Sequence, residues 1–250
     1  MIKQFFTSLG EYFLLLKEAL KKPQKRNVYF KLLMREIYDL GVNSFGLVMF
    51  TSFFVGAVVA IQMYNNFSAS PFPIPNSFIG YATKAVLILE FSPTIISVIL
   101  AGKVGSYIAS SIGTMRVTEQ IDAMDIMGVN SANFLILPKI VASMIFNPLL
   151  IAISIVIGIW GGHIAGIATG NWTKAQYITG IQMYMPQFFI WYAFLKTVVF
   201  AFLIATIPAY FGYNVKGGSL EVGRASTQAV VWTMVAVIIM DLILTQMLLS

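Results

Sequence analysis

The sequence contains no cysteine and only one histidine, His163, among its 250 residues. The absence of cysteine excludes disulfides, thiol catalysis and thiolate metal sites, and a single histidine argues against a histidine-based metal site. Charged residues are also scarce, at 10% of the chain, whereas about a quarter of a soluble domain is charged. We therefore expect no metal site and a class of protein that does not rely on a charged, water-facing surface.

Hydrophobic residues are abundant instead, at 58% of the sequence, and the mean hydropathy is +0.81. The apolar runs are continuous rather than alternating with period two, which is typical of membrane helices and not of a membrane β-barrel. A helix of about 20 apolar residues crosses the hydrocarbon core. The predicted spans are residues 43–64, 78–112, 138–169, 186–211 and 225–249. The predicted fold is an all-α, polytopic membrane protein with about five transmembrane helices, and residues 41–250 form its membrane domain.

The basic residues are concentrated near the N-terminus. Eight of the sixteen lysines and arginines precede residue 36, namely Lys3, Lys17, Lys21, Lys22, Lys25, Arg26, Lys31 and Arg35. This bias is typical of a cytoplasmic flank near anionic headgroups, so we expect a cytoplasmic N-terminus, a C-terminus on the opposite side and no nucleic-acid partner.

The same N-terminal region, residues 1–40, also carries apolar residues at helical spacings. They are Phe5, Phe6, Leu9, Phe13, Leu16 and Leu20. The spacing predicts an amphipathic helix in the membrane interface. A cytoplasmic helix docked on a partner is the alternative.

Three ionisable residues lie deep inside the predicted spans, away from their ends: Glu90, Lys196 and Asp241. Each costs about 3 kcal/mol or more near the bilayer centre, so each is expected to face a partner or a wet cavity. Two interpretations remain open. The three residues neutralise one another, or they form a polar lining for a substrate with a charged head and apolar tails.

Glycines recur every fourth residue in the third predicted span, at Gly158, Gly162 and Gly166. Because no side chain projects from such a ridge, another helix can approach closely, and the pattern predicts a packing seam. His163 lies beside these glycines, and we interpret it as a packing residue rather than a catalyst.

Acidic residues gather in the stretch RVTEQIDAMDIMGVN, between the second and third predicted spans. We predict a cytoplasmic helix over residues 116–128. Its apolar face is formed by Val117, Ile121, Met124 and Gly128, and its charged stripe by Arg116, Glu119, Asp122 and Asp125. A net acidic helix is poorly suited to anionic lipid, so this one is expected to bury its apolar face in a groove of a soluble partner.

Two other function classes are compatible with parts of the sequence. Asp122 and Asp125 permit a membrane-embedded lipid-headgroup transferase, although a bare DxxD is a weak motif. A secondary transporter would normally show two related halves, which the sequence lacks. Gly102-Lys103 is not a phosphate-binding loop, because Val104 stands where Ser or Thr is required. We therefore predict a non-catalytic chain that takes its energy from another subunit or from an ion gradient.

The run LAGKVGSYIASSIGTMRVTEQIDAMDIMGVNSANFLILPKIVA resembles the signature of the MlaE-type permeases, the membrane subunits of MCE-associated lipid ABC transporters. The resemblance continues through GIWGGHIAG, FLKTVVFAF and GRASTQAVV. It implies a homodimeric permease of the bacterial inner membrane, with a periplasmic C-terminus. Such a permease moves phospholipid between that membrane and a conduit of periplasmic MCE-domain proteins to the outer membrane. A separate cytoplasmic ABC ATPase binds ATP and Mg²⁺, and no cofactor is implied for this chain.

The resemblance also implies roles for individual residues. The positions that couple to the ATPase are Arg116, Thr118, Glu119, Gln120, Asp122, Asp125 and Gly128. The polar lining of the lipid cavity corresponds to Glu90, Lys196 and Asp241, and a cytoplasmic arginine corresponds to Arg224. A known family member has an arginine where this chain has Leu89, so a different lipid or binding pose is expected here.

Overall fold

The computed structural model describes residues 2–22, 26–72 and 74–249. Lys25, and the side chains of Lys3, Phe5 and Arg26, lie outside the described part. All regular structure in the described residues is helical, and five stretches are long and apolar enough to cross a membrane. They are Asn27–Ser68, Ser77–Val117, Ser131–Thr169, Gln187–Tyr213 and Ser219–Leu248. The predicted all-α class with five membrane helices is therefore confirmed, and the chain is a multi-pass membrane protein.

The first two spans are each assembled from several consecutive helical segments. The first comprises α2 (Arg26–Glu36), the π-helical η1 (Ile37–Gly41), the 3-10 segment η2 (Val42–Ser44) and α3 (Phe45–Ser68). The second comprises α4 (Ser77–Val86), the π-helical η3 (Leu87–Ile95), α5 (Ile96–Leu100), the π-helical η4 (Ala101–Gly105) and α6 (Ser106–Val117). The remaining spans are α8 (Ser131–Thr169), α10 (Gln187–Tyr213) and α11 (Ser219–Leu249).

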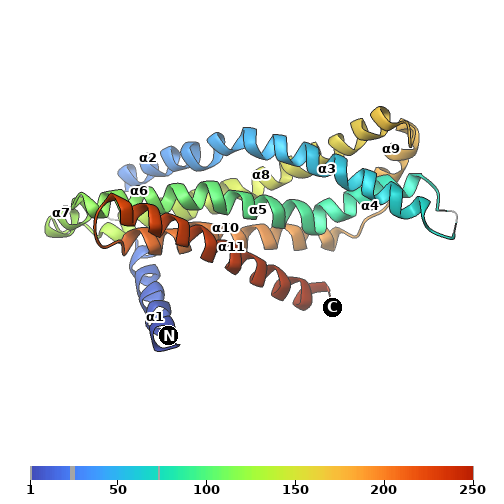
Figure 1. Ribbon diagram of the computed structural model, residues 1–250. Coiled ribbons are helices and arrows are strands. Elements are labelled where there is room, and N and C mark those ends of the chain that lie inside the picture. The colour runs from blue at the N-terminus through green and yellow to red at the C-terminus, as the bar shows by residue number, and fades with distance from the viewer. Residues whose placement is uncertain (1, 23–25, 73, 250) are drawn as a thin grey trace.

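Three shorter helices complete the fold: α1 (Ile2–Ala19), α7 (Gln120–Ile126) and α9 (Lys174–Gln182). The long helices run side by side in one bundle (Figure 1). The helix α7, the start of α11 and the attachment of α1 lie at one end of the bundle, and α9 lies at the other. We call the first of these the α7 end.

The second span remains helical although it contains Pro93, which lies inside η3. Proline removes a backbone donor and its ring crowds the preceding turn, so a regular α-helix kinks or breaks there. In membrane helices a local change to π-helical geometry accommodates the proline. Glu90 lies in the same π-helical segment, so η3 combines the proline of this span with its acidic residue.

The helices α3 and α8 approach closely at glycines. A Cβ atom on Gly56 would collide with the Gly158 carbonyl oxygen, and one on Gly161 would collide with the Phe53 carbonyl oxygen. Gly162 and Gly166 face aromatic rings instead, because a Cβ there would collide with Tyr177 and Trp172 respectively. The glycine ridge thus serves two contacts, one with α3 and one with the chain around α9.

The short helix α9 and the length of α3 were not expected. The first predicted span ends at residue 64, but α3 continues to Ser68. The helix α9 begins with a capping box, in which Thr173 and Gln176 exchange hydrogen bonds. Lys84 anchors the chain at the end of α9, where its Nζ donates to the carbonyl oxygens of Ile181 and Met183 at 2.8 and 2.7 Å.

The helix α1 leaves the bundle at a steep angle (Figure 1). Its C-terminal half packs against the bundle through Leu16 and Ala19, which are buried, and Tyr12 donates a hydrogen bond of 2.8 Å to Thr206 Oγ1 on α10. Phe6 and Phe13 are 67% and 62% exposed. The helix therefore presents aromatic side chains away from the protein, and its position in the membrane interface stays a prediction.

Candidate functional site

The three ionisable residues predicted to lie deep in the spans meet in one cluster, which we call the ionic cluster: Glu90, Lys196 and Asp241. Lys196 Nζ on α10 lies 2.9 Å from Glu90 Oε2 on η3 and 2.7 Å from Asp241 Oδ1 on α11. One ammonium thus faces two carboxylates that come from two other helices. Because charges are costly in an apolar interior unless they are paired, this contact satisfies each member while holding three helices in register.

Hydroxyl and carbonyl groups complete the ionic cluster. Thr94 Oγ1 donates to Asp241 Oδ1 at 3.1 Å, and Lys196 Nζ donates to the Leu89 carbonyl oxygen at 3.3 Å. Tyr192 lies one turn before Lys196, its hydroxyl is 2.9 Å from Thr245 Oγ1, and the lysine ammonium lies 4.7 Å from the Tyr192 ring centroid. Leu89 therefore contributes its backbone carbonyl oxygen to the ionic cluster, and its side chain brings no charge.

Sequence reasoning missed the three hydroxyl residues Thr94, Tyr192 and Thr245. A signal was present, because Glu90 and Thr94, Tyr192 and Lys196, and Asp241 and Thr245 are each four residues apart in a helical region. Residues four apart share a helix face. A polar residue at that distance from an intramembrane charge is thus a candidate partner.

The members of the ionic cluster differ in how far they can be reached from outside. The Lys196 side chain is completely buried, that of Asp241 is 17% exposed and that of Glu90 is 42% exposed. The structure therefore shows the three residues neutralising one another, and the lining of a lipid cavity stays a prediction. Lys196 is enclosed and neutralised, whereas Glu90 presents one face of the ionic cluster outside the protein.

The stretch between α6 and α8 is a second candidate site, and its structure differs from the predicted helix over residues 116–128. The helix α6 ends at Val117, Glu119 adopts a left-handed conformation with φ 58°, and α7 covers only Gln120–Ile126. The predicted start at Arg116 is therefore wrong. The Thr118 hydroxyl donates to the Thr114 carbonyl oxygen and the chain reverses at Glu119, so Arg116 and Glu119 do not belong to α7.

Arg116 still contacts α7 across this break, because its guanidinium lies 2.7 Å from Asp122 Oδ1. The same guanidinium lies over the ring of Tyr213 at 5.9 Å, and the Tyr213 hydroxyl is 2.8 Å from Ser131 Oγ at the start of α8. These contacts fasten α7 to the ends of α6, α8 and α10. Gly128 follows α7 with φ 76°, a backbone conformation that glycine adopts readily.

The apolar face of α7 points toward its own bundle, which corrects the expectation that this face enters a partner. Ile121 is completely buried, and Met124 packs against the same core. The free apolar surface lies at the end of the helix instead, where Ile126 and Met127 are 87% and 71% exposed. The error arose because helical periodicity identifies an apolar face but not what covers it.

The polar residues around α7 are exposed. They are Thr118, Glu119, Gln120, Asp122 and Asp125. Within the described residues, no group of three or more His, Asp or Glu side chains has an arrangement that could hold a metal ion. The carboxylate of Asp122 instead pairs with Arg116. The exposed surface around α7 therefore consists of carboxylate, hydroxyl and amide groups beside the apolar side chains of Ile126 and Met127.

A second buried ion pair was not predicted. Lys139 Nζ on α8 lies 2.6 Å from Glu36 Oε1 on α2, and the two side chains are 5% and 15% exposed. Arg224, by contrast, is exposed near the start of α11 and pairs with Glu221 at 2.6 Å.

Comparisons with known proteins agree with this architecture. The sequence profile of the family described as Permease MlaE matches residues 33–247. A probable ABC transporter permease of Rickettsia typhi is 36% identical over 98% of this chain and 93% of its own length. The intermembrane phospholipid transport system permease protein MlaE of Haemophilus influenzae is 30% identical over 96% of this chain and 92% of its own. The chloroplastic protein TRIGALACTOSYLDIACYLGLYCEROL 1 of Arabidopsis thaliana is 28% identical over 88% of this chain and 62% of its own.

Proposed function

Because this chain belongs to the MlaE permease family, we propose that it is the membrane subunit of an ABC transporter that moves phospholipid. The lipid passes between the bacterial inner membrane and a conduit of MCE-domain proteins that leads to the outer membrane. The Haemophilus relative is named for intermembrane phospholipid transport. The observation that carries the proposal is the ionic cluster, in which the exposed face of Glu90 offers a polar contact on an otherwise apolar side of the bundle.

A lipid with a charged head and apolar tails fits such a place. The head contacts Glu90 and the hydroxyl groups of Thr94 and Thr245, while the tails lie along the apolar faces of the spans. Lys196 neutralises Glu90 and Asp241 and so acts as a positioning residue. The absence of an arginine at Leu89 leaves this side of the ionic cluster without a free cation, which favours lipids whose heads carry a hydrogen-bond donor or a cationic group.

The energy comes from a separate cytoplasmic ATPase that binds at α7. The apolar contacts are Ile126 and Met127, and the rim consists of Thr118, Glu119, Gln120, Asp122 and Asp125. An apolar tip surrounded by polar groups fits a groove on a soluble partner. Because Arg116 at the end of α6 pairs with Asp122 of α7 and lies against Tyr213 of α10, movement of α7 is transmitted to α10, the helix that carries Lys196.

The proposed assembly contains two copies of this chain, with the N-terminus and the α7 end in the cytoplasm and the C-terminus in the periplasm. The basic N-terminal region supports this orientation. The helix α11 has a continuous exposed apolar face, which includes Val231, Val235, Ile238 and Leu242. A second copy packed along this face would enclose the exposed side of the ionic cluster between the two chains.

The experiment is purification of the tagged chain, expressed from its own operon, in a mild detergent. We expect an ATPase and an MCE-domain protein to co-purify, and lipid mass spectrometry to find bound phospholipid. Phospholipid should also stimulate ATP hydrolysis by the complex. Recovery of the chain without any ATPase would refute the proposal.

A further inference from the structure

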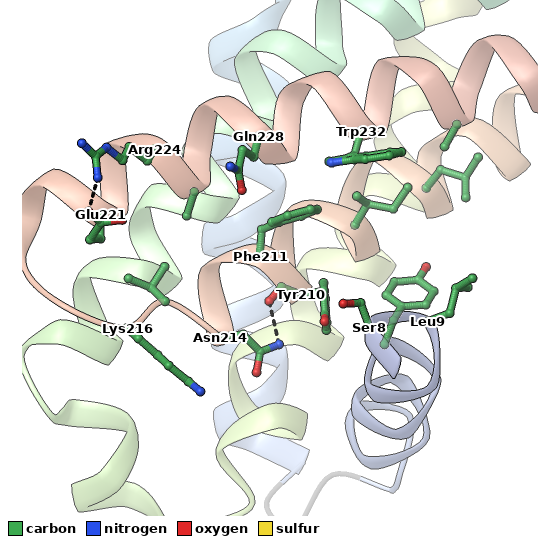
Figure 2. Close-up of a pocket in the computed structure, with 16 residues that line it drawn as sticks. Ser8, Leu9, Tyr210, Phe211, Asn214, Lys216, Glu221, Arg224, Gln228 and Trp232 are labelled. Atoms are coloured by element: carbon green, nitrogen blue, oxygen red, sulfur yellow. Dashed lines mark hydrogen bonds and ion pairs between the residues drawn. The ribbon is translucent and has the colours of Figure 1, made fainter. Parts of the chain in front are cut away.

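A large groove lies at the α7 end, away from the ionic cluster. It has a volume of about 1170 Å³ and is formed by α1, α10 and α11. Figure 2 shows Ser8 and Leu9 of α1 on one side, Phe211 of α10 and Trp232 of α11 on another, and Lys216 and Arg224 toward one end. Binding cavities for small molecules are typically about 300–1,000 Å³, so this groove is large enough for a ligand bigger than most metabolites.

The lining of the groove changes from charged to apolar along α11. Glu221 and Arg224 come first, Gln228 follows, and Trp232 and Ala236 lie farthest along the helix from the charged end. Glu221 and Ala236 are fifteen residues apart, which corresponds to about 22 Å at 1.5 Å per residue. Half of a hydrocarbon core is about 15 Å. Along a membrane-crossing helix, a groove of this length covers about one leaflet.

The charged end favours an anion. Lys216 and Arg224 contribute two cations and Glu221 one carboxylate, which pairs with Arg224 at 2.6 Å. Lys216 forms no ion pair with any residue that the structure describes. A guanidinium has five N–H donors, so Arg224 keeps donors for a second acceptor after it binds Glu221. This end therefore offers one unpaired ammonium and a partly used guanidinium. The two groups point to different sides in Figure 2, so the flexible Lys216 side chain turns toward Arg224 when both bind one ligand.

We propose that this groove binds one anionic glycerophospholipid from the leaflet at the α7 end, with its phosphate at Lys216 and Arg224 and its acyl chains along Leu203, Phe211 and Trp232. The site is separate from the ionic cluster, because Arg224 and Asp241 are seventeen residues apart on α11, or about 25 Å. It rests on the proposed function in one respect, the placement of the α7 end at the cytoplasmic face.

A lipid fits the groove better than a second copy of the chain. The walls come from three helices of one chain and enclose a hollow, whereas helix packing needs a face that another helix can follow. A membrane-spanning helix also rarely carries the charge that would pair with Lys216. Tyr12 and Tyr210 hold α1 against α10, through the Tyr12 hydrogen bond to Thr206 and a ring contact of 5.9 Å, so the groove exists without a partner.

The test uses the full chain in phosphatidylcholine nanodiscs that contain a small fraction of phosphatidylglycerol with a diazirine in one acyl chain. After illumination, peptide mapping should find the label around Phe211 and Trp232. Lys216→Gln should lower this yield about fivefold. This is the change in lipid binding that corresponds to about 1 kcal/mol, the contribution of one basic residue near anionic lipid. The matched control is Lys174→Gln, which removes an exposed lysine at the opposite end and should leave the yield unchanged.

Two further measurements keep the proposal open to refutation. A diazirine phosphatidylcholine probe should label the groove more weakly and should not respond to Lys216→Gln. Equal labelling by both probes, or no label in the groove, would overturn the proposal. Gln228→Cys provides a clean probe for a second copy, because the chain has no cysteine of its own; a disulfide-linked dimer in membranes would assign the groove to that copy instead.

This labelling requires no ATPase, so its outcome is independent of the test of the transporter. A labelled groove in a chain that recovers no ATPase would refute the transporter and retain the lipid site. Recovery of an ATPase complex whose groove is not labelled would support the transporter and refute the lipid site.

Discussion

Replacing Lys196 with methionine should destabilise the protein more than replacing either of the carboxylates that it contacts. Lys196 is completely buried and is the only cation of the ionic cluster. Methionine has a similar length and no charge, so Lys196→Met leaves Glu90 and Asp241 close together without a positive partner. Asp241→Asn is milder, because Lys196 then still has Glu90.

The magnitude follows from how far each carboxylate is exposed. Removing one partner of a buried ion pair costs about 3–5 kcal/mol. Glu90 is 42% exposed at the protein surface and has room to move away from Asp241, whereas Asp241 is only 17% exposed. We therefore expect the lower end, about 3 kcal/mol of unfolding free energy, for Lys196→Met and about 1–2 kcal/mol for Asp241→Asn. The double variant Lys196→Met/Asp241→Asn should lose less unfolding free energy than Lys196→Met alone. The reason is that the Asp241 carboxylate, which Lys196→Met leaves unpaired, is then removed as well.

The assay is thermal unfolding of purified protein in one detergent, followed by tryptophan fluorescence. For a chain of this size, a loss of about 3 kcal/mol lowers the Tm by roughly 6–12 °C. Lys174→Met serves as the control, because it removes an exposed lysine outside the spans. A Tm for Lys196→Met equal to that of the control, or strictly additive losses in the double variant, would show that the cluster does not act as one unit.

Three further outcomes follow from particular contacts. Met127→Glu should lower co-purification of the ATPase at least tenfold by placing a charge in the apolar tip of α7, while Leu220→Glu, at another exposed apolar position of the same end, should not. Gly161→Ala should cost more than about 2 kcal/mol in thermal unfolding, because its Cβ collides with backbone of α3, and Gly46→Ala should be neutral because nothing lies within 4 Å of its Cβ. Glu119→Gly should raise the unfolding free energy by up to about 1 kcal/mol by relieving the left-handed backbone; a loss of stability would show that the Glu119 side chain makes a stabilising contact.

Much of the fold was predictable because a membrane imposes simple requirements on sequence. An uncharged apolar run of sufficient length has few alternatives to a transmembrane helix, so the five spans followed from hydropathy. The helix ends were less predictable. The chain continues as helix past Asn65, and α9 forms in a region rich in polar residues and glycine, because local capping by Thr173 and Gln176 outweighs weak helix propensity.

The candidate sites were predictable as residues but not as contacts. Periodicity correctly grouped Ile121 and Met124 on one face of α7, but only packing against the bundle shows that this face is buried and that Ile126 and Met127 are free. The interruption at Glu119 was invisible for a similar reason. Its left-handed backbone results from a chain reversal between two packed helices, and no glycine marks the place.

By itself, the sequence determined that this protein is a bundle of membrane helices with three intramembrane charges and a polar stretch between its second and third spans. Those properties depend on composition and on spacing along one chain. The tertiary structure alone decided that Glu90, Lys196 and Asp241 meet, that Glu90 keeps an exposed face, and that α1 closes a groove against α10 and α11. Residues more than a hundred positions apart come together only when helices pack, and how they pack depends on side-chain shape across the whole bundle.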